Sequence, residues 1–256
     1  MAGRTRIKPE AYQHWLATAG TQRLLALEAG WLREWVSQLH GQHLLYTGID
    51  NDPRFLKRGR LQHSFRMGLE WQQGVATAEG RMAESAWPFA DNSLDVVVLQ
   101  HSLDMSGRPH QIIREATRSV LPNGYLIITG FNPYSLWGGV RWLRTFSTGL
   151  PWITNPVSER RLRDWLILLD FRIETVCPIA HTWPLTLGSE GISRRADRVL
   201  AGAHWLPASA YLLVARKTIA GMTPIRPKRW QLKDHSFGLA QPVASREQET
   251  ENIHAG

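Results

Sequence analysis

The first part of the chain repeats apolar positions with the period of a helix. Between residues 10 and 39 apolar side chains recur every three or four positions, which is the pattern of a helix buried along one face: Leu24, Leu27, Leu32, Trp35, Val36 and Leu39. Gly41 follows the last of them and is a typical stop signal. The pattern predicts an N-terminal helical cap over residues 1–41.

From residue 42 onward, short apolar runs alternate with helical segments. The runs predict strands at 43–48, 64–71, 94–99, 125–129, 171–176 and 211–215, with 64–71 the weakest of them. Helices are predicted to begin at Pro109, after Ser158 and after Ser189. This alternation predicts an α/β domain with a mostly parallel sheet over residues 42–218. A Pro-rich, basic extension follows over residues 219–256, and its end has the character of a disordered tail.

Composition narrows the class of protein. Of the 256 residues 43% are hydrophobic and 20% are charged, which excludes wholesale disorder. A single cysteine excludes disulfides within the chain and a Cys-rich zinc site, and we expect no metal. No apolar run is long enough for a transmembrane segment and no signal peptide is visible, so we expect a cytoplasmic protein.

The net charge of the chain is +8, and basic residues gather between Arg216 and Lys233. This segment is interpreted as a solvated basic tail, with nucleic-acid binding as a weaker hypothesis.

Ligands of parallel α/β sheets bind beyond the carboxyl ends of the strands. Those ends are Gly48, residues 69–71, His101 and the turn 130–133, so we expect them to lie close together in space. His101 is placed there for general-base catalysis or for orienting a substrate, and a neutral histidine lining the cleft is an equal alternative. Asp104, three residues later, is a candidate to orient His101 or to bind a cationic substrate.

Residues 83–138 carry several motifs in a characteristic order. Trp87-Pro88-Phe89 precedes Asp91-Asn92-Ser93-Leu94-Asp95; a strand, the helix from Pro109 and the turn Pro122-Asn123-Gly124 follow; and the segment ends in Gly130-Phe131-Asn132-Pro133-Tyr134-Ser135-Leu136-Trp137-Gly138. Together they resemble the methyltransferase type 11 group of class I S-adenosylmethionine (SAM)-dependent methyltransferases, in a branch of small bacterial methyltransferase-like proteins. The resemblance implies a Rossmann-like sheet with an antiparallel last strand, SAM as the cofactor, and a small-molecule or macromolecular methyl acceptor that the sequence does not identify.

The resemblance also implies roles for individual residues. Asn132 would lie near the substrate. Gly48 would contact the methionine part of the cofactor, Glu70 its ribose hydroxyls and Glu84 its adenine side. Asp50 and Trp87 are further expected cofactor contacts.

The cofactor motif itself departs from the family pattern. Where the family has D-x-G-x-G, this chain has Tyr46-Thr47-Gly48-Ile49-Asp50, so one glycine remains and Ile49 narrows the space beside it. Ala83 stands where the adenine-side Asp is expected. Two hypotheses follow: a SAM-dependent methyltransferase, or a non-catalytic binding or regulatory protein on a degenerate methyltransferase fold. A groove plugged by Ile49 and its neighbours would remove the basis of the enzyme hypothesis.

Overall fold

A computed structural model describes residues 9–58, 60–72, 79–143, 150, 152, 154–181 and 207–218. The described residues all belong to one compact unit, which lies within residues 1–221. The helix predicted after Ser189 and the basic extension lie outside the described residues. No helix in the described ranges is long and apolar enough to span a membrane.

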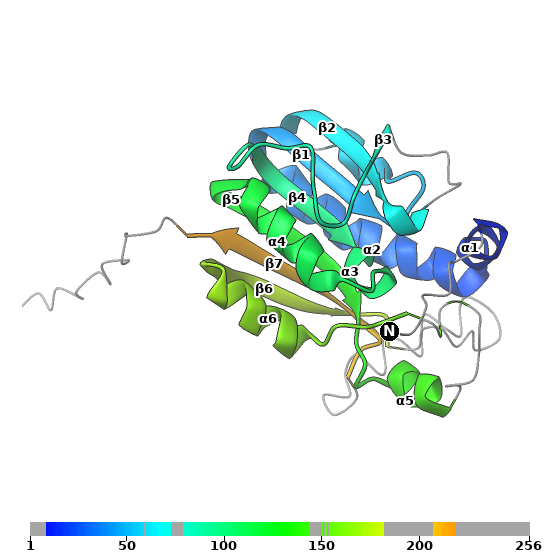
Figure 1. Ribbon diagram of the computed structural model, residues 1–256. Helices are drawn as coiled ribbons and strands as arrows, with labels where there is room; N and C mark the ends of the chain where they lie inside the picture. The colour runs from blue at the N-terminus through cyan, green and yellow to red at the C-terminus, as the bar shows by residue number, and fades with distance from the viewer. Residues whose placement is uncertain are drawn as a thin grey trace, which may run out of the picture. The chain divides into compact units, whose positions relative to one another are not determined.

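The described strands form one seven-stranded sheet in the order β3-β2-β1-β4-β5-β7-β6 (Figure 1). Their bounds are β1 His40–Gly48, β2 Arg60–Leu69, β3 Gly80–Met82, β4 Leu94–Gln100, β5 Val120–Phe131, β6 Phe171–Ile179 and β7 Ala210–Lys217. The neighbours from β3 to β5 pair in parallel, whereas β7 pairs antiparallel with both β5 and β6. The predicted mostly parallel α/β sheet with an antiparallel last strand is confirmed.

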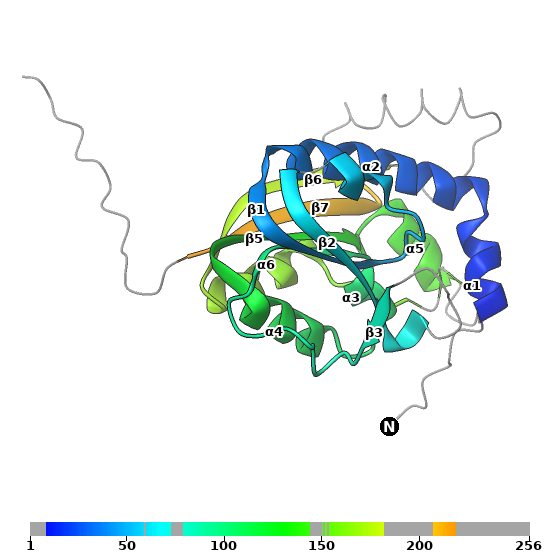
Figure 2. The same cartoon turned by 90° about the horizontal axis from the view of Figure 1, so that it is seen from above.

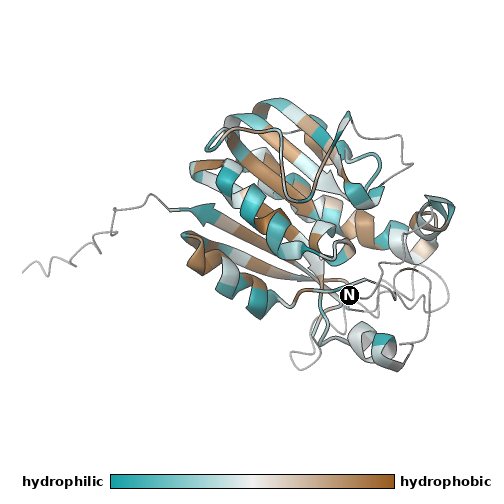
Figure 3. Cartoon of the chain, in the orientation of Figure 1, coloured by the Kyte–Doolittle hydropathy of each residue, from teal (hydrophilic) through white to brown (hydrophobic). Residues whose placement is uncertain are grey.

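Helices cover the two faces of the sheet. In Figure 2, α2 (Ala19–Gln38) lies on one side and α4 (Pro109–Ser119) with α6 (Glu159–Leu168) on the other. The short helices α1 (Pro9–Leu16), α3 (Ser102–Met105) and α5 (Leu136–Leu143) complete the α-helices that the structure describes. Apolar residues concentrate on the central strands, as Figure 3 shows, because these strands are covered on both faces.

The N-terminal helical segment differs from its prediction in two ways. It is two helices rather than one, because Thr18 adopts an extended conformation and starts α2. The buried face of α2 also differs at one position: Leu27 is 39% exposed, and Leu25 is buried instead. Glu28 lies on the buried face with Leu24 and Leu32, with consequences for the site described below.

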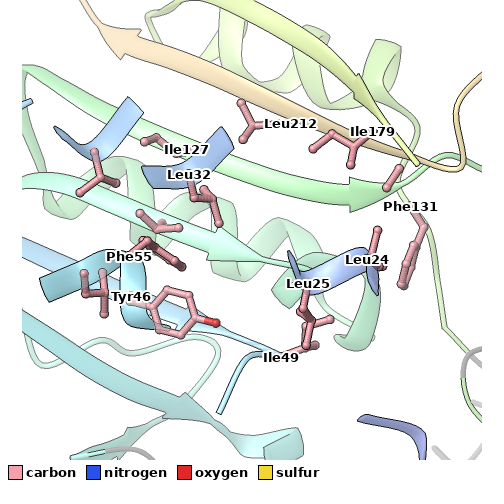
Figure 4. Packing of buried hydrophobic residues seen from close by; sticks show 14 of the residues in the cluster. Leu24, Leu25, Leu32, Tyr46, Ile49, Phe55, Ile127, Phe131, Ile179 and Leu212 are labelled. Atoms are coloured by element: carbon pink, nitrogen blue, oxygen red, sulfur yellow. The ribbon is translucent and has the colours of Figure 1, made fainter. Parts of the chain in front are cut away.

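The connection between β1 and β2 lacks the α-helix that usually joins parallel strands. Among the described residues of 49–59 there is only a short 3-10 helix, η1 (Arg54–Arg58). Instead, α2 covers this face, and its leucines pack with Tyr46, Ile49 and Phe55 (Figure 4). The N-terminal helices therefore reach the edge where β1 and β4 end.

Several local predictions are confirmed. Pro109 begins α4, and the Ser158 side chain caps α6 by accepting a hydrogen bond from the Arg161 N–H. Asn123 and Asp170 have φ values of 66° and 62°, the left-handed conformation that Asn and Asp tolerate better than most residues. The three-residue strand β3 was not predicted, because so short a segment has no measurable period.

Candidate functional site at the carboxyl edge of the sheet

The predicted strand ends do come together. Gly48 pairs with Gln100 across β1 and β4, and the His101 N–H donates to Thr129 of β5 at 3.0 Å. The short helix η2 (Glu70–Gln72), which follows β2, reaches the same place because the Gln72 amide donates to the Gly48 carbonyl at 2.6 Å. The chain thus brings three loops to one edge.

The backbone around Gly48 is hydrogen-bonded by the protein's own side chains. The Thr47 carbonyl accepts from the Ser102 hydroxyl at 2.8 Å, and the Gly48 carbonyl from Gln72. The Ile49 carbonyl accepts from the Tyr12 hydroxyl, also at 2.8 Å, and the Ile49 N–H donates to the Gln100 carbonyl at 3.1 Å. Every carbonyl of the motif from Thr47 to Ile49 is therefore already paired.

Side chains fill the space beside this backbone. Ile49 is fully buried among Leu24, Leu25 and Tyr46 (Figure 4). The Tyr46 hydroxyl donates to the Gln100 side-chain oxygen at 2.7 Å, and burial, followed by the nearby Asp50 carboxylate, raises the pKa of Tyr46 well above its usual value. A Cβ on Gly48 would lie 2.5 Å from Gln100 Cβ, so the glycine is required by packing of the neighbouring strand.

A buried ionisable network lies next to this backbone. Glu28, His101 and Asp104 are each at most 1% exposed. His101 Nε2 lies 2.6 Å from Glu28 Oε1, and His101 Nδ1 lies 2.9 Å from Asp104 Oδ2. Burial lowers the pKa of His101, but the two carboxylates outweigh it and raise the pKa to about 9. His101 is therefore an imidazolium at neutral pH, and both of its N–H groups point at carboxylates.

This arrangement bears directly on the predicted role of His101. A general base needs a free ring nitrogen that faces a reacting group, and in this state both nitrogens are engaged and buried. His101 also has a φ of 53°, an uncommon backbone conformation for a residue other than glycine. The network instead holds a strained backbone position at the end of β4.

Asp104 connects the network to two further segments. Its carboxylate accepts from the Phe131 N–H at 2.8 Å and from the Val157 N–H at 3.3 Å. Its backbone carbonyl accepts from the Asn155 N–H at 2.7 Å. Burial raises the pKa of Asp104, while its hydrogen bond with His101 acts in the opposite direction. Asp104 thus fixes the end of β5 and the start of α6.

The remaining predicted residues are dispersed. Glu70 is exposed at the end of β2, whereas Glu84 is 2% exposed. Trp87 is buried in the core on the opposite face of the sheet from α2. The Asn132 side-chain oxygen accepts from the Tyr134 N–H at 3.0 Å, so it is used to shape its own turn. Asp50 lines a groove of about 770 Å³ between the N-terminal helices and the loop after β1.

Sequence reasoning missed five members of the site: Tyr12, Glu28, Gln72, Gln100 and Ser102. The hydrophobic pattern of the helix did indicate one of them, because Glu28 falls between Leu24 and Leu32 on an apolar face. A carboxylate at such a position is buried only when it has a partner. The partner lies 73 positions away in the chain, so only the folded structure identifies it.

Comparison with known proteins agrees with this architecture. Residues 27–128 match a protein family described as a methyltransferase domain. The chain has the fold of the class I methyltransferases. It resembles a possible histamine N-methyltransferase structure from Thermotoga maritima with a TM-score of 0.61 and 14% identity, over 82% of this chain and 96% of that one.

Two curated relatives are more similar in sequence. The chain is 30% identical over 142 residues to the uncharacterized protein YafS of Escherichia coli, covering 56% of this chain and 58% of YafS. It is 32% identical over 140 residues to the ubiquinone/menaquinone biosynthesis C-methyltransferase UbiE of a Ruegeria species, covering 50% of this chain and 49% of UbiE. The chain therefore spans about half the length of the curated relatives it matches.

The family implies SAM binding, but the residues around Gly48 do not fit that ligand in the described state. A SAM molecule held in the family manner needs backbone groups and open space beside the glycine. Here the carbonyls accept from Ser102, Gln72 and Tyr12, and Ile49 fills the space.

Proposed function

We propose that this protein is a non-catalytic binding protein built on the methyltransferase fold, and that it does not hold SAM at Gly48. The observation that carries the proposal is the complete pairing of the carbonyls from Thr47 to Ile49 by the protein's own side chains. Methyl transfer requires the cofactor and the acceptor to be aligned in one water-free site. A site filled by its own side chains does not provide that alignment.

The free energy needed to open the site supports this conclusion. Admitting a ligand beside Gly48 requires breaking the bonds from Tyr12 and Gln72 and exposing Ile49. Two hydrogen bonds cost about 2 kcal/mol together, and exposing one buried Ile side chain costs about 2 kcal/mol more. A total near 4 kcal/mol weakens binding about a thousandfold.

Calorimetric titration of the full chain with SAM and with S-adenosylhomocysteine tests the proposal. We expect no heat of binding at high micromolar ligand. The double variant Tyr12→Phe/Ile49→Gly removes one hydrogen bond and the blocking side chain, so it should bind S-adenosylhomocysteine more tightly than the unaltered chain. Tyr134→Phe, at a side chain that is 73% exposed, is the matched control. Tight binding by the unaltered chain would refute the proposal.

A second candidate is SAM-dependent methyl transfer to an unidentified acceptor. The family match over residues 27–128 and the likeness to UbiE favour it. In that case Gly48, Asp50, Glu70, Glu84 and Trp87 remain the proposed cofactor contacts, with His101 as the proposed catalytic residue and Asp104 and Asn132 beside the acceptor. It requires α1 to withdraw Tyr12 from Ile49, and micromolar SAM affinity would establish it over the first.

A further inference from the structure

A second cavity, of about 440 Å³, opens at the same edge of the sheet and includes none of the predicted site residues. Three segments enclose it: the approach to α4 at residues 106–110, the turn after β5 at 133–134, and the approach to α6 with its first turns at 155–165. α4 and α6 lie on the same face of the sheet (Figure 1). The volume suits a small organic ligand.

The walls of this cavity are held in place from beneath. Asp104 ties the end of β5 and the segment 155–157 to α3 through its hydrogen bonds with Phe131, Val157 and Asn155. The turn after β5 is held by Asn132 and also by Gly138, where a Cβ would lie 1.8 Å from the Pro133 carbonyl. The buried Asp104 carboxylate and the close packing at Gly138 therefore hold the walls of the cavity in fixed positions.

The charge of the lining is one-sided. The charged lining side chain is Arg161, and the lining contains no Asp or Glu. Arg161 has no carboxylate partner among the described residues, although its neighbour Arg163 pairs with Glu159. The cavity also receives the first turns of α4 and α6, whose N–H ends favour an anion.

A buried hydroxyl helps to hold one wall of the cavity. Ser106 is fully buried, and its side-chain oxygen accepts from the Arg108 N–H at 2.8 Å. This hydrogen bond fixes the approach to α4, which forms that wall.

Aromatic rings form the remaining wall. Trp165 packs against the His110 ring with centroids 3.8 Å apart, and the Arg161 guanidinium lies 5.3 Å from the Trp165 ring. Tyr134 stands at the rim and is 73% exposed. Such rings offer flat surfaces on which another ring can stack.

We propose that this cavity binds a small aromatic anion, namely a monocyclic or bicyclic aromatic compound that bears a carboxylate or a phosphate. The anionic group contacts Arg161, and the ring lies against Trp165 and Tyr134. This site is separate from Gly48, so the proposal stands whether or not SAM binds.

Calorimetry of the full chain tests the proposal with phenyl phosphate and benzoate as the aromatic anions. Inorganic phosphate serves as an anion without a ring, and benzylamine as a ring with a positive charge. We expect phenyl phosphate or benzoate to bind more tightly than either control. Equal binding of benzylamine, or no binding of both aromatic anions at about 10 mM, would overturn the proposal.

Variants assign the contacts. Arg161→Gln should weaken the preferred aromatic anion about tenfold, whereas Arg163→Gln on the same helix should leave its affinity within about twofold. Tyr134→Ala should weaken the aromatic anion and leave inorganic phosphate unchanged. An affinity unaffected by Arg161→Gln would show that any binding occurs elsewhere.

Discussion

Replacing Glu28 by Gln removes one charge from the buried network while keeping the shape of the side chain. Glu28 is fully buried, and its two oxygens lie 2.6 Å from Gln100 Nε2 and 2.6 Å from His101 Nε2. The amide has one acceptor oxygen for these two donors, so one buried donor loses its hydrogen bond, which costs about 2 kcal/mol, while Asp104 still pairs with the His101 imidazolium. We expect the free energy of unfolding at pH 7 to fall by about that amount.

The pH dependence of the free energy of unfolding follows from the pKa of His101. The pKa of His101 rises from 6.5 in the unfolded chain to about 9 in the folded chain, which is worth roughly 3 kcal/mol. Because the folded chain binds this proton more tightly, the stabilisation is complete below about pH 6.5 and is lost as the pH rises through about 9. Glu28→Gln lowers the folded pKa of His101, so the loss of stability between pH 6.5 and 9 should shrink.

Urea unfolding at pH 6.5, 7 and 9 measures both effects, and an NMR titration of the His101 ring measures its pKa directly. Glu34→Gln, on the exposed side of the same helix, is the control and should change stability by less than about 0.5 kcal/mol. A Glu28→Gln profile parallel to that of the unaltered chain would refute the reasoning. So would a His101 ring that titrates near 6.5.

Three further substitutions test the packing and the network. Gly138→Ala should destabilise the protein by more than about 2 kcal/mol, because its Cβ would meet the Pro133 carbonyl, whereas Gly139→Ala in the same helix meets nothing within 4 Å and should be neutral or stabilising by thermal unfolding. Gly30→Ala, inside α2 with open space around it, should stabilise by about 1 kcal/mol in urea titrations, and a loss of stability would contradict the described packing. Asp104→Asn should cost about 2 kcal/mol in the same titrations, since it replaces the charge-assisted hydrogen bonds of Asp104 with His101 and Phe131 by weaker neutral contacts.

The sequence predicted the architecture because the relevant signals are local. The continuous apolar run at Val96–Leu99 marks a strand buried on both faces, and Pro109 marks the start of a helix. Asn123 could replace a glycine because its short polar side chain tolerates a positive φ. Each of these features is decided within a few residues of the chain.

The state of the site could not be predicted in the same way. Tyr46 and Ile49 signalled a degenerate motif, and Ile49 was expected to narrow the space beside Gly48, but nothing in the pattern indicated the hydrogen bonds from Tyr12 and Gln72. Tyr12 meets Ile49 across 37 positions, and Glu28 meets His101 across 73. Such contacts depend on how the N-terminal helices lie on the sheet. The period predicted the buried positions Leu24, Leu32, Val36 and Leu39 of this segment, but not what their side chains and those between them contact.

The central claim is that the protein's own side chains occupy the place beside Gly48. A crystal structure of the full chain grown with millimolar S-adenosylhomocysteine tests it most directly. We predict that the Tyr12–Ile49 and Gln72–Gly48 hydrogen bonds remain and that no nucleoside lies between β1 and η2. Density for the nucleoside against Gly48, with Tyr12 displaced, would contradict the account.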